Sequence, residues 1–324
     1  MEITRKLISD LASTDPLMRY RAMDALASRR ADSFEMMLAL LTQGNPYQRA
    51  SAAEILGRWR ADNAFDQLAE SAHDHDTTVR ARCIEALGLI DPERAQMPLL
   101  NATRDPNAEV RAWAIDVLGR IPIPLARQAL DAATCDPDAN VRWHAAESMA
   151  RRDGKRAAGQ LLRLLRDADA GVRALVAEWL GRLQVSAAQE PLIELLQDPD
   201  HDVRWRATDA LVALGSKRAE THLLAQLYHA DDGVRWRAAY ALGRLKSQKA
   251  IKPLIAALED PNAHVRARAA EALGHIGDTR AISALRAHAH DIASAGHLGA
   301  VGEVVQAAIE MIEFGENKTH ASKK

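Results

Sequence analysis

The sequence has few aromatic residues, few cysteines and little net charge, and each shortage excludes a class of protein. Aromatic residues make up 4% of the 324 residues, and the charges nearly cancel to a formal net charge of −2. Such a chain has no overall electrostatic attraction to nucleic acid or to anionic membranes. Its two cysteines, Cys83 and Cys135, are too few for a disulfide framework, and we expect both to be reduced thiols.

Long apolar runs are also missing from the chain. No stretch approaches the roughly 18 apolar residues that a membrane-spanning helix needs. The first residues, MEITRKLISDL, are amphipathic and include acidic side chains, unlike the apolar core of a secretory signal. We therefore expect a cytoplasmic protein without a membrane segment.

What the sequence does contain is a repeat of 31 residues. Arginine recurs at this interval from Arg49 to Arg266, and from Arg80 onward a valine precedes each one. The arginines predicted to form a structural ladder are Arg80, Arg111, Arg142, Arg173, Arg204, Arg235 and Arg266. A period this regular indicates a stack of similar units, each too small to bury a core alone.

Each unit reads as two helices joined by a short turn. In residues 250–280, apolar side chains at Ile251, Leu254 and Leu258 have helical spacing, and Pro261 then interrupts the helix. A second apolar pattern begins near Val265 and ends at a glycine. The same plan recurs along the chain and predicts an all-α fold of about ten two-helix repeats.

The repeats are expected to form one continuous domain over residues 1–314. Residues 1–30 and 281–314 depart from the repeat pattern, as expected of capping repeats that end a stack. The last residues, 315–324, are polar and are predicted to be a disordered tail.

One sequence motif resembles a known family. The pattern Asp-Pro-x-x-x-Val-Arg-x-x-Ala-x-x-Ala-Leu-Gly, which residues 260–274 match almost letter for letter, is similar to the HEAT-like repeat of the phycobilisome-lyase type. The resemblance covers roughly residues 10–290 and implies an α-solenoid, a superhelix of stacked helix pairs. That family includes bilin lyases, deoxyhypusine hydroxylases, assembly factors and binding scaffolds. The resemblance therefore predicts the fold but does not select one activity.

An aspartate accompanies the recurring arginine. It stands five residues before the valine in most units, and His229 is the exception in that series. On a helical wheel the arginine lies at the flank of the apolar side, at the seam with a neighbouring helix. We expect each arginine to bridge to a loop aspartate of its own or an adjacent repeat and so to set the stacking angle.

The side of the second helix opposite the core varies between units, and the resemblance implies that it lines a concave groove. Acid–arginine pairs such as Glu54–Arg58 lie there at i,i+4 spacing, which an ordinary solvated helix surface explains. Trp143, Trp205 and Trp236 share one position on this side. Exposed aromatic residues beside arginines are typical of binding hot spots, although these tryptophans could instead pack between repeats. The predicted partner-binding residues are Trp113, Trp143, His144, Trp205, Arg206, Trp236, Arg237 and Tyr240.

The leading functional hypothesis is a non-catalytic, monomeric scaffold or assembly factor that binds another protein or a peptide segment. The first alternative, suggested by the resemblance, is a lyase or chaperone-like factor for a tetrapyrrole such as bilin or haem, or for its acceptor protein. Aromatic walls with arginines would suit a flat ring that carries propionates. A second alternative is nucleic-acid binding, as in HEAT-like DNA glycosylases, but the row of acids and the near-neutral charge oppose it.

Catalytic and metal-binding motifs give no positive signal. The chain has no His-Glu dipeptide of the kind that binds iron in deoxyhypusine hydroxylases, and no nucleophile–base motif or phosphate loop. Alternating His/Asp residues at 73–76 and the histidines His288, His290 and His297 could recruit zinc, but such residues more often cap turns. We therefore predict no catalytic residue, metal or cofactor. Whether the protein is an enzyme stays open, and the resemblance would imply a lyase.

Overall fold

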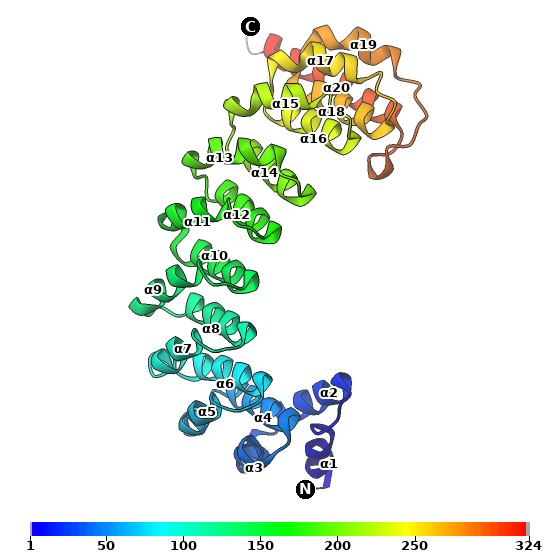
Figure 1. The fold of residues 1–324 in the computed structure, drawn as a ribbon. Helices are drawn as coiled ribbons and strands as arrows, with labels where there is room; N and C mark the ends of the chain where they lie inside the picture. The colour runs from blue at the N-terminus through cyan, green and yellow to red at the C-terminus, as the bar shows by residue number, and fades with distance from the viewer. Residues whose placement is uncertain (1, 322–324) are drawn as a thin grey trace. The chain divides into compact units, whose positions relative to one another are not determined.

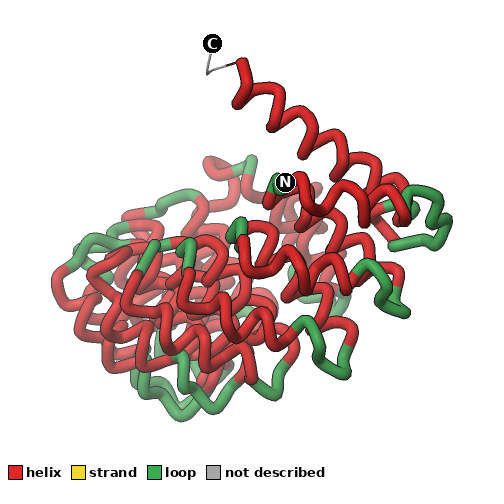
Figure 2. The backbone as a smooth tube through the Cα atoms, turned by 90° about the horizontal axis from the view of Figure 1, so that it is seen from above, coloured by secondary structure: helices red, strands yellow, loops and turns green. Residues whose placement is uncertain are grey.

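The computed structural model describes residues 2–321, and their regular structure is helical. The exception within these residues is one isolated antiparallel bridge between Ser294 and Ala300. Figure 2 shows the helical backbone with short connecting loops. The predicted all-α solenoid of two-helix repeats is confirmed.

Helices α1 to α20 alternate as first and second helices of successive repeats. The first helices are α1 (Glu2–Asp10), α3 (Arg30–Gln43), α5 (Phe65–Ser71), α7 (Gln96–Ala102), α9 (Pro124–Ala133), α11 (Ala158–Leu164), α13 (Gln189–Glu194), α15 (Glu220–Gln226), α17 (Ile251–Ala257) and α19 (Ile282–Ala287). The second helices are α2 (Pro16–Ala27), α4 (Pro46–Arg58), α6 (Thr77–Ile90), α8 (Ala108–Arg120), α10 (Ala139–Asp153), α12 (Ala170–Arg182), α14 (His201–Ala213), α16 (Asp232–Arg244), α18 (Ala263–Ile276) and α20 (Val301–Ala321).

The array divides into two compact units, of which unit 1 ends at Leu164 and unit 2 begins at Leu165. Within unit 1, the first helices α5, α7 and α9 form one layer and the second helices α6, α8 and α10 form the other (Figure 1). Within unit 2, α16 packs on α18, and α18 packs on α20. The predicted single domain over residues 1–314, with its capping repeats, therefore remains a prediction.

The second helices begin at side-chain caps. Asp200 accepts from the amides of Asp202 and Val203 at the start of α14, and Asn262 accepts from His264 and Val265 at the start of α18. Such caps satisfy amides that have no partner within the helix. At the other end of α18, Gly277 adopts a left-handed conformation with φ 77°, which glycine adopts without steric cost.

The core lies between the two helix layers and along the row of second helices. Recurring valines such as Val203 and Val265 are fully buried. In α4, α6, α8, α12, α16 and α18, the glycine near the end of the helix lies where the next second helix approaches closely. A Cβ added to Gly181 would lie 2.6 Å from the Cα of Ala210, and one added to Gly243 would lie 2.5 Å from the Cα of Ala272. The repeated Leu-Gly therefore allows close helix packing.

The C-terminal helix is longer than the sequence predicts. Helix α20 continues to Ala321, whereas residues 315–324 are predicted to be disordered, and residues 322–324 lie outside the described part. Seven residues of the predicted tail are thus helical, because no proline or glycine stop follows Gly315. None of the helices between residues 2 and 321 combines the length and apolar character needed to cross a membrane.

Candidate functional site

An arginine–aspartate ladder fixes the spacing of neighbouring repeats. Arg80 donates from Nε and Nη2 to both carboxylate oxygens of Asp105, at 2.8 and 2.9 Å, and from Nη1 to the carbonyl of Asp74 in its own repeat. Each such ion pair, called a rung here, joins an arginine to the residue 25 positions further along the chain. Further rungs with this geometry include Arg49–Asp74, Arg111–Asp136, Arg173–Asp198, Arg235–Asp260 and Arg266–Asp291.

The rungs are largely buried and change the acidity of their carboxyl groups. The side chains of Arg80 and Asp105 are 12% and 10% exposed. Burial alone would raise the pKa of Asp105, but hydrogen bonds from Arg80 and from the Asn107 amide hold that pKa below its ordinary value. Because the rungs hold successive second helices in register, side chains at equivalent positions lie in a row along each unit.

Unit 2 carries a row of aromatic rings on the face of its second helices that points away from the first helices. The Trp205 ring of α14 meets the Trp236 ring of α16 edge to face, with centroids 6.0 Å apart. His201 extends the row beyond Trp205, and His264 and His297 extend it beyond Trp236, with centroids 5.0 to 6.1 Å apart. Aromatic pairs prefer these separations and edge-on geometry.

Two arginines pack against this row of rings. The guanidinium of Arg237 lies 4.6 Å from the centroid of the Trp205 ring and 4.7 Å from that of Trp236. The guanidinium of Arg268 lies 5.6 Å from the Trp236 ring and 5.5 Å from the Tyr240 ring. These distances are typical of cation–π contacts. Together the rings and guanidinium groups form a continuous surface, here called the aromatic–arginine row, whose members are His201, Trp205, Trp236, Arg237, Tyr240, His264, Arg268 and His297.

Arg237 lies inside the row rather than on its surface. It is 4% exposed, although it lies on the side of α16 that the helical wheel places opposite the core. The rings of Trp205 and Trp236, from two neighbouring helices, both contact the guanidinium and contribute to this burial. Burial, and next the charge of Arg204, lowers the pKa of Arg237. Among the described residues no carboxylate lies within ion-pair distance of it.

The histidines at the ends of the row accept hydrogen bonds. Arg237 and Arg268 reach Nε2 of His201 and of His297, each at 3.2 Å. Arginine only donates, so Nε2 of His201 and Nε2 of His297 are the acceptors in these two hydrogen bonds. On the other side of the His201 ring, Nδ1 lies 3.2 Å from Asp202 Oδ1, which matches a proton on Nδ1. The row is thus ordered by directional contacts as well as by packing.

Trp205 is the most accessible ring of the predicted set. It is 42% exposed, and its Nε1 donates to Asp209 Oδ2 at 2.7 Å. Arg206, on the next position of α14, is exposed and pairs with Glu178 at 2.9 Å instead of joining the row. The structure therefore brings Trp205, Trp236, Arg237 and Tyr240 together and leaves Arg206 beside them.

The other predicted site residues lie in unit 1. Arg82 lies over the ring of Trp113 at 5.5 Å, and Trp143 contacts His144 edge to face at 5.1 Å. Burial lowers the pKa of His144, whose buried Nδ1 has no hydrogen-bond partner among the described residues. The predicted residues Trp113, Trp143 and His144 do not form a continuous row of the kind seen in unit 2.

Unit 1 also contains a groove of about 630 Å³, which is lined by residues of α2, α4 and α6. Its lining includes Tyr20 and Tyr47, which are 59% and 43% exposed, and Arg19 lies 4.5 Å from the Tyr47 ring. Glu54 and Arg82 lie in the same groove and form an ion pair at 3.6 Å. None of these groove residues belongs to the predicted partner-binding set.

The histidine–aspartate segments considered for zinc serve structural contacts. Asp74 pairs with Arg49, and Asp76 caps α6. His288 lies 3.1 Å from Glu259 and 2.9 Å from the carbonyl of Ala284. Over the described residues, no group of three His, Cys, Asp or Glu side chains has an arrangement that could hold a metal ion.

Sequence reasoning missed His201, His264, Arg268 and His297 as members of the row. The sequence did indicate two of them. Arg268 occupies the same repeat position as Arg237, and His264 directly precedes the valine-arginine pair at residues 265–266. Positions three apart on a helix share a side. His264 could therefore have been placed near Ala267, which occupies the position of Trp205 and Trp236 in its repeat. His297 follows the end of the repeat pattern, where no period locates it.

Comparison with known proteins supports the fold. The structure is similar to YibA of E. coli, with 23% identity and a TM-score of 0.57 over 76% of this chain and 92% of YibA. It is also similar to importin beta, with 17% identity and a TM-score of 0.71, and to Kap95p, with 13% and 0.69. Each match covers 95% of this chain, which spans 51% of importin beta and 50% of Kap95p. At such identities the likeness concerns the fold alone.

No curated protein sequence matches the chain. The model of the HEAT-repeat family, in contrast, matches residues 4–88, 34–102, 97–172, 160–232 and 220–295. These overlapping matches cover nearly the whole array of helix pairs. The protein therefore belongs to the family of HEAT repeats.

Proposed function

We propose that the protein is a non-catalytic scaffold that binds a segment of another protein on the aromatic–arginine row of unit 2. The observation that carries this proposal is the partial exposure of Trp205 within a row of ordered rings and guanidinium groups. Tryptophan, tyrosine and arginine are the residues most enriched among those that dominate binding energies. Solenoids with this fold are typical protein-binding scaffolds, and Kap95p, a structural neighbour, binds RanGDP.

The row is ordered before any partner arrives. Arg237 is held by contacts with two tryptophan rings and with His201, and Arg268 is held by Glu271 at 2.7 Å. Side chains that are already fixed lose little conformational entropy on binding, which favours affinity. The rings provide apolar area, and the guanidinium edges provide donors for carbonyl and carboxylate oxygens.

Affinity capture from cell extract followed by mass spectrometry tests this proposal. The wild type is compared with Trp205→Ala, which removes the exposed ring, and with the control Tyr228→Ala. Tyr228 is 70% exposed just after α15, a first helix, and so lies outside the row. We expect Trp205→Ala to lose partners that the wild type and the control retain. Retention of the same partners by both variants would refute the assignment of the site.

A further inference from the structure

One rung of the arginine–aspartate ladder lacks its carboxylate. In the flanking rungs, Arg173 and Arg235 each bind both oxygens of an aspartate 25 residues later, at 2.7 to 2.9 Å. The residue 25 positions after Arg204 is His229. Within the described part of the chain, no carboxylate lies within ion-pair distance of Arg204. We call Arg204 and His229 the incomplete rung.

Arg204 is nevertheless held in the position of a rung arginine. Its Nη1 donates to the carbonyls of Asp198 and Pro199 at 2.8 and 2.9 Å. Arg235, which forms a complete rung, is anchored in the same way, on the carbonyls of His229 and Ala230, both at 2.9 Å. The Nε of Arg204 is buried and has no hydrogen-bond partner among the residues that the structure describes. The edge that binds a carboxylate in the other rungs is therefore preoriented here.

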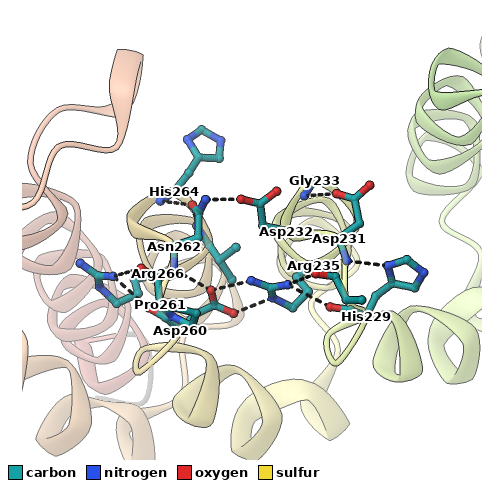
Figure 3. A network of polar contacts seen from close by, with 12 residues as sticks. His229, Asp231, Asp232, Gly233, Arg235, Asp260, Pro261, Asn262, His264 and Arg266 are labelled. Atoms are coloured by element: carbon teal, nitrogen blue, oxygen red, sulfur yellow. Dashed lines mark hydrogen bonds and ion pairs between the residues drawn. The ribbon is translucent and has the colours of Figure 1, made fainter.

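His229 performs only one of the two tasks of the aspartate that it replaces. Figure 3 shows Asp260 binding Arg235 and also accepting from the Asn262 amide, at 2.9 Å. His229 accepts from the amide of Asp231 through Nδ1, at 3.0 Å, and so stabilises the turn. Because Nδ1 accepts, the ring carries its proton on Nε2, so Nε2 is a donor. A donor has replaced the acceptor that Arg204 would bind.

A cavity lies beside the incomplete rung. Its volume is about 210 Å³, and Arg204, Gln226 and His229 line it together with the apolar Leu196 and Val234. One water molecule has a share of roughly 30 Å³ in the liquid, so the cavity has room for a small organic group.

The charge around the cavity is positive. Arg204 and the buried Arg237 line a narrow space that adjoins the same residues, Leu196, Gln226 and Val234. Asp198 also lines the cavity, but Arg173 binds its two carboxylate oxygens. Arg204 is half-buried and Arg237 is buried, and both lack a carboxylate partner among the described residues. Removing a guanidinium from water without a counter-charge is costly, and an anion that enters the cavity would reduce that cost.

We propose that the incomplete rung binds a carboxylate supplied by a ligand, with both oxygens held by Nε and Nη2 of Arg204. The neutral His229 ring can add a third hydrogen bond from Nε2. The ligand would thus complete the ladder with the group that the other rungs take from their own chain. The carboxylate can belong to a small molecule or to an acidic residue of a partner protein, because the group recognised is the same. This proposal is independent of the aromatic–arginine row as the partner site.

The first test measures thermal stability in sodium formate against sodium chloride of equal ionic strength. We expect a saturable rise in melting temperature of the wild type in formate, because a ligand that binds only the folded state stabilises it. His229→Asp supplies the missing carboxylate, so it should melt higher without formate and respond no more to formate than to chloride. Arg204→Lys keeps the charge but loses the two-pronged geometry, and should weaken formate binding about tenfold or more.

A gain-of-site variant provides the matched control. Asp105→His converts the complete rung of Arg80 in unit 1 into a second incomplete rung, and we expect it to gain a formate response. An equal response of the wild type and His229→Asp would overturn the proposal, because it would show a general salt effect. Absence of any response in the wild type, at concentrations up to the molar range, would overturn it as well.

The source of the carboxylate is distinguished by comparing two probes. Calorimetric titrations use formate and N-acetyl-aspartate amide, which presents the carboxylate as a protein side chain does. Tighter binding of the aspartate derivative, lost in His229→Asp, assigns the site to a carboxylate on a peptide, whereas tighter binding of formate assigns it to a small free anion. If inorganic phosphate binds more tightly than both, the assignment to a carboxylate is wrong.

Discussion

The guanidinium of Arg80 binds both carboxylate oxygens of Asp105, which stands 25 residues later and belongs to the next repeat. The same guanidinium donates to a carbonyl of its own repeat. The Arg80 side chain thus joins two consecutive repeats, because donors on two edges of its guanidinium bind one repeat each. Charge-assisted, two-pronged hydrogen bonds of this kind fix geometry as well as adding stability.

Asp105→Asn should destabilise unit 1. The change removes the charge partner of a largely buried arginine, so we expect the free energy of unfolding to fall by about 1–3 kcal/mol in urea titrations. The control is Glu194→Gln, which alters an exposed ion pair with Arg166 and should change stability by less than about 0.5 kcal/mol. Equal effects of the two changes would mean that the rungs do not stabilise the stack.

Gly243→Ala should destabilise the packing between α16 and α18. The new Cβ would lie 2.5 Å from the Cα of Ala272, so the two helices must move apart, at a cost of about 1–3 kcal/mol. Gly159→Ala is the control, because no heavy atom lies within 4 Å of its new Cβ on helix α11. Alanine favours a helix over glycine by about 0.5–1 kcal/mol, so the control should be stabilised. Effects of the same sign would contradict this interpretation.

Arg237→Lys should weaken the aromatic–arginine row. Lysine keeps the charge but lacks the flat guanidinium that contacts both the Trp205 and the Trp236 ring, and we expect a loss of about 1–2 kcal/mol in stability. Arg206→Lys is a matched control at the same repeat position, because Arg206 is exposed and pairs with Glu178. Chemical denaturation followed by tryptophan fluorescence measures both. Equal stability of both variants would show that the stacking of Arg237 contributes nothing.

Stability should fall as the pH drops below about 6.5, in part through His264. Burial lowers the pKa of His264 below its ordinary value of 6.5; the hydrogen bond to Ala295 partly opposes this, and the charge of Arg268 adds to it. Below pH 6.5 the unfolded chain binds a proton at this residue that the folded chain still excludes, so protonation favours unfolding. The loss continues until the pH reaches the lowered pKa of the folded state.

Urea midpoints of the wild type and His264→Phe at pH 7.5 and pH 5.5 measure this contribution. Phenylalanine keeps a ring beside Trp236 but cannot be protonated, so we expect a smaller decrease of the midpoint in this variant. His290→Phe, at an exposed loop position, is the control and should retain the decrease of the wild type. A decrease of the same size in all three proteins would exclude His264 as a contributor.

Much of the fold follows from the period, because residues at equal intervals perform equal tasks in every repeat. The recurring Val203 and Val265 are buried as the helical wheel predicts. The exception at His229 was also visible in the sequence, although the cavity beside it was not. A repeat pattern locates side chains within one unit, whereas a cavity depends on how two neighbouring units fill the space between them.

The candidate site was only partly predictable for the same reason. The wheel identified the side of the helix that carries Trp205 and Trp236, and these rings do meet. The burial of Arg237 was not predictable, because a wheel describes one helix, whereas rings on two helices contribute to that burial. His297 lies beyond the last regular repeat, so no spacing in the sequence could connect it with Arg268.

The most direct test of the proposed scaffold is hydrogen–deuterium exchange of the protein with and without its captured partner. We predict slower exchange on binding in α14, α16 and α18, which carry Trp205, Trp236 and Arg268, and little change in α13, α15 and α17. Exchange that slows in the first helices and stays the same in α14, α16 and α18 would contradict the assignment of the partner site to the aromatic–arginine row.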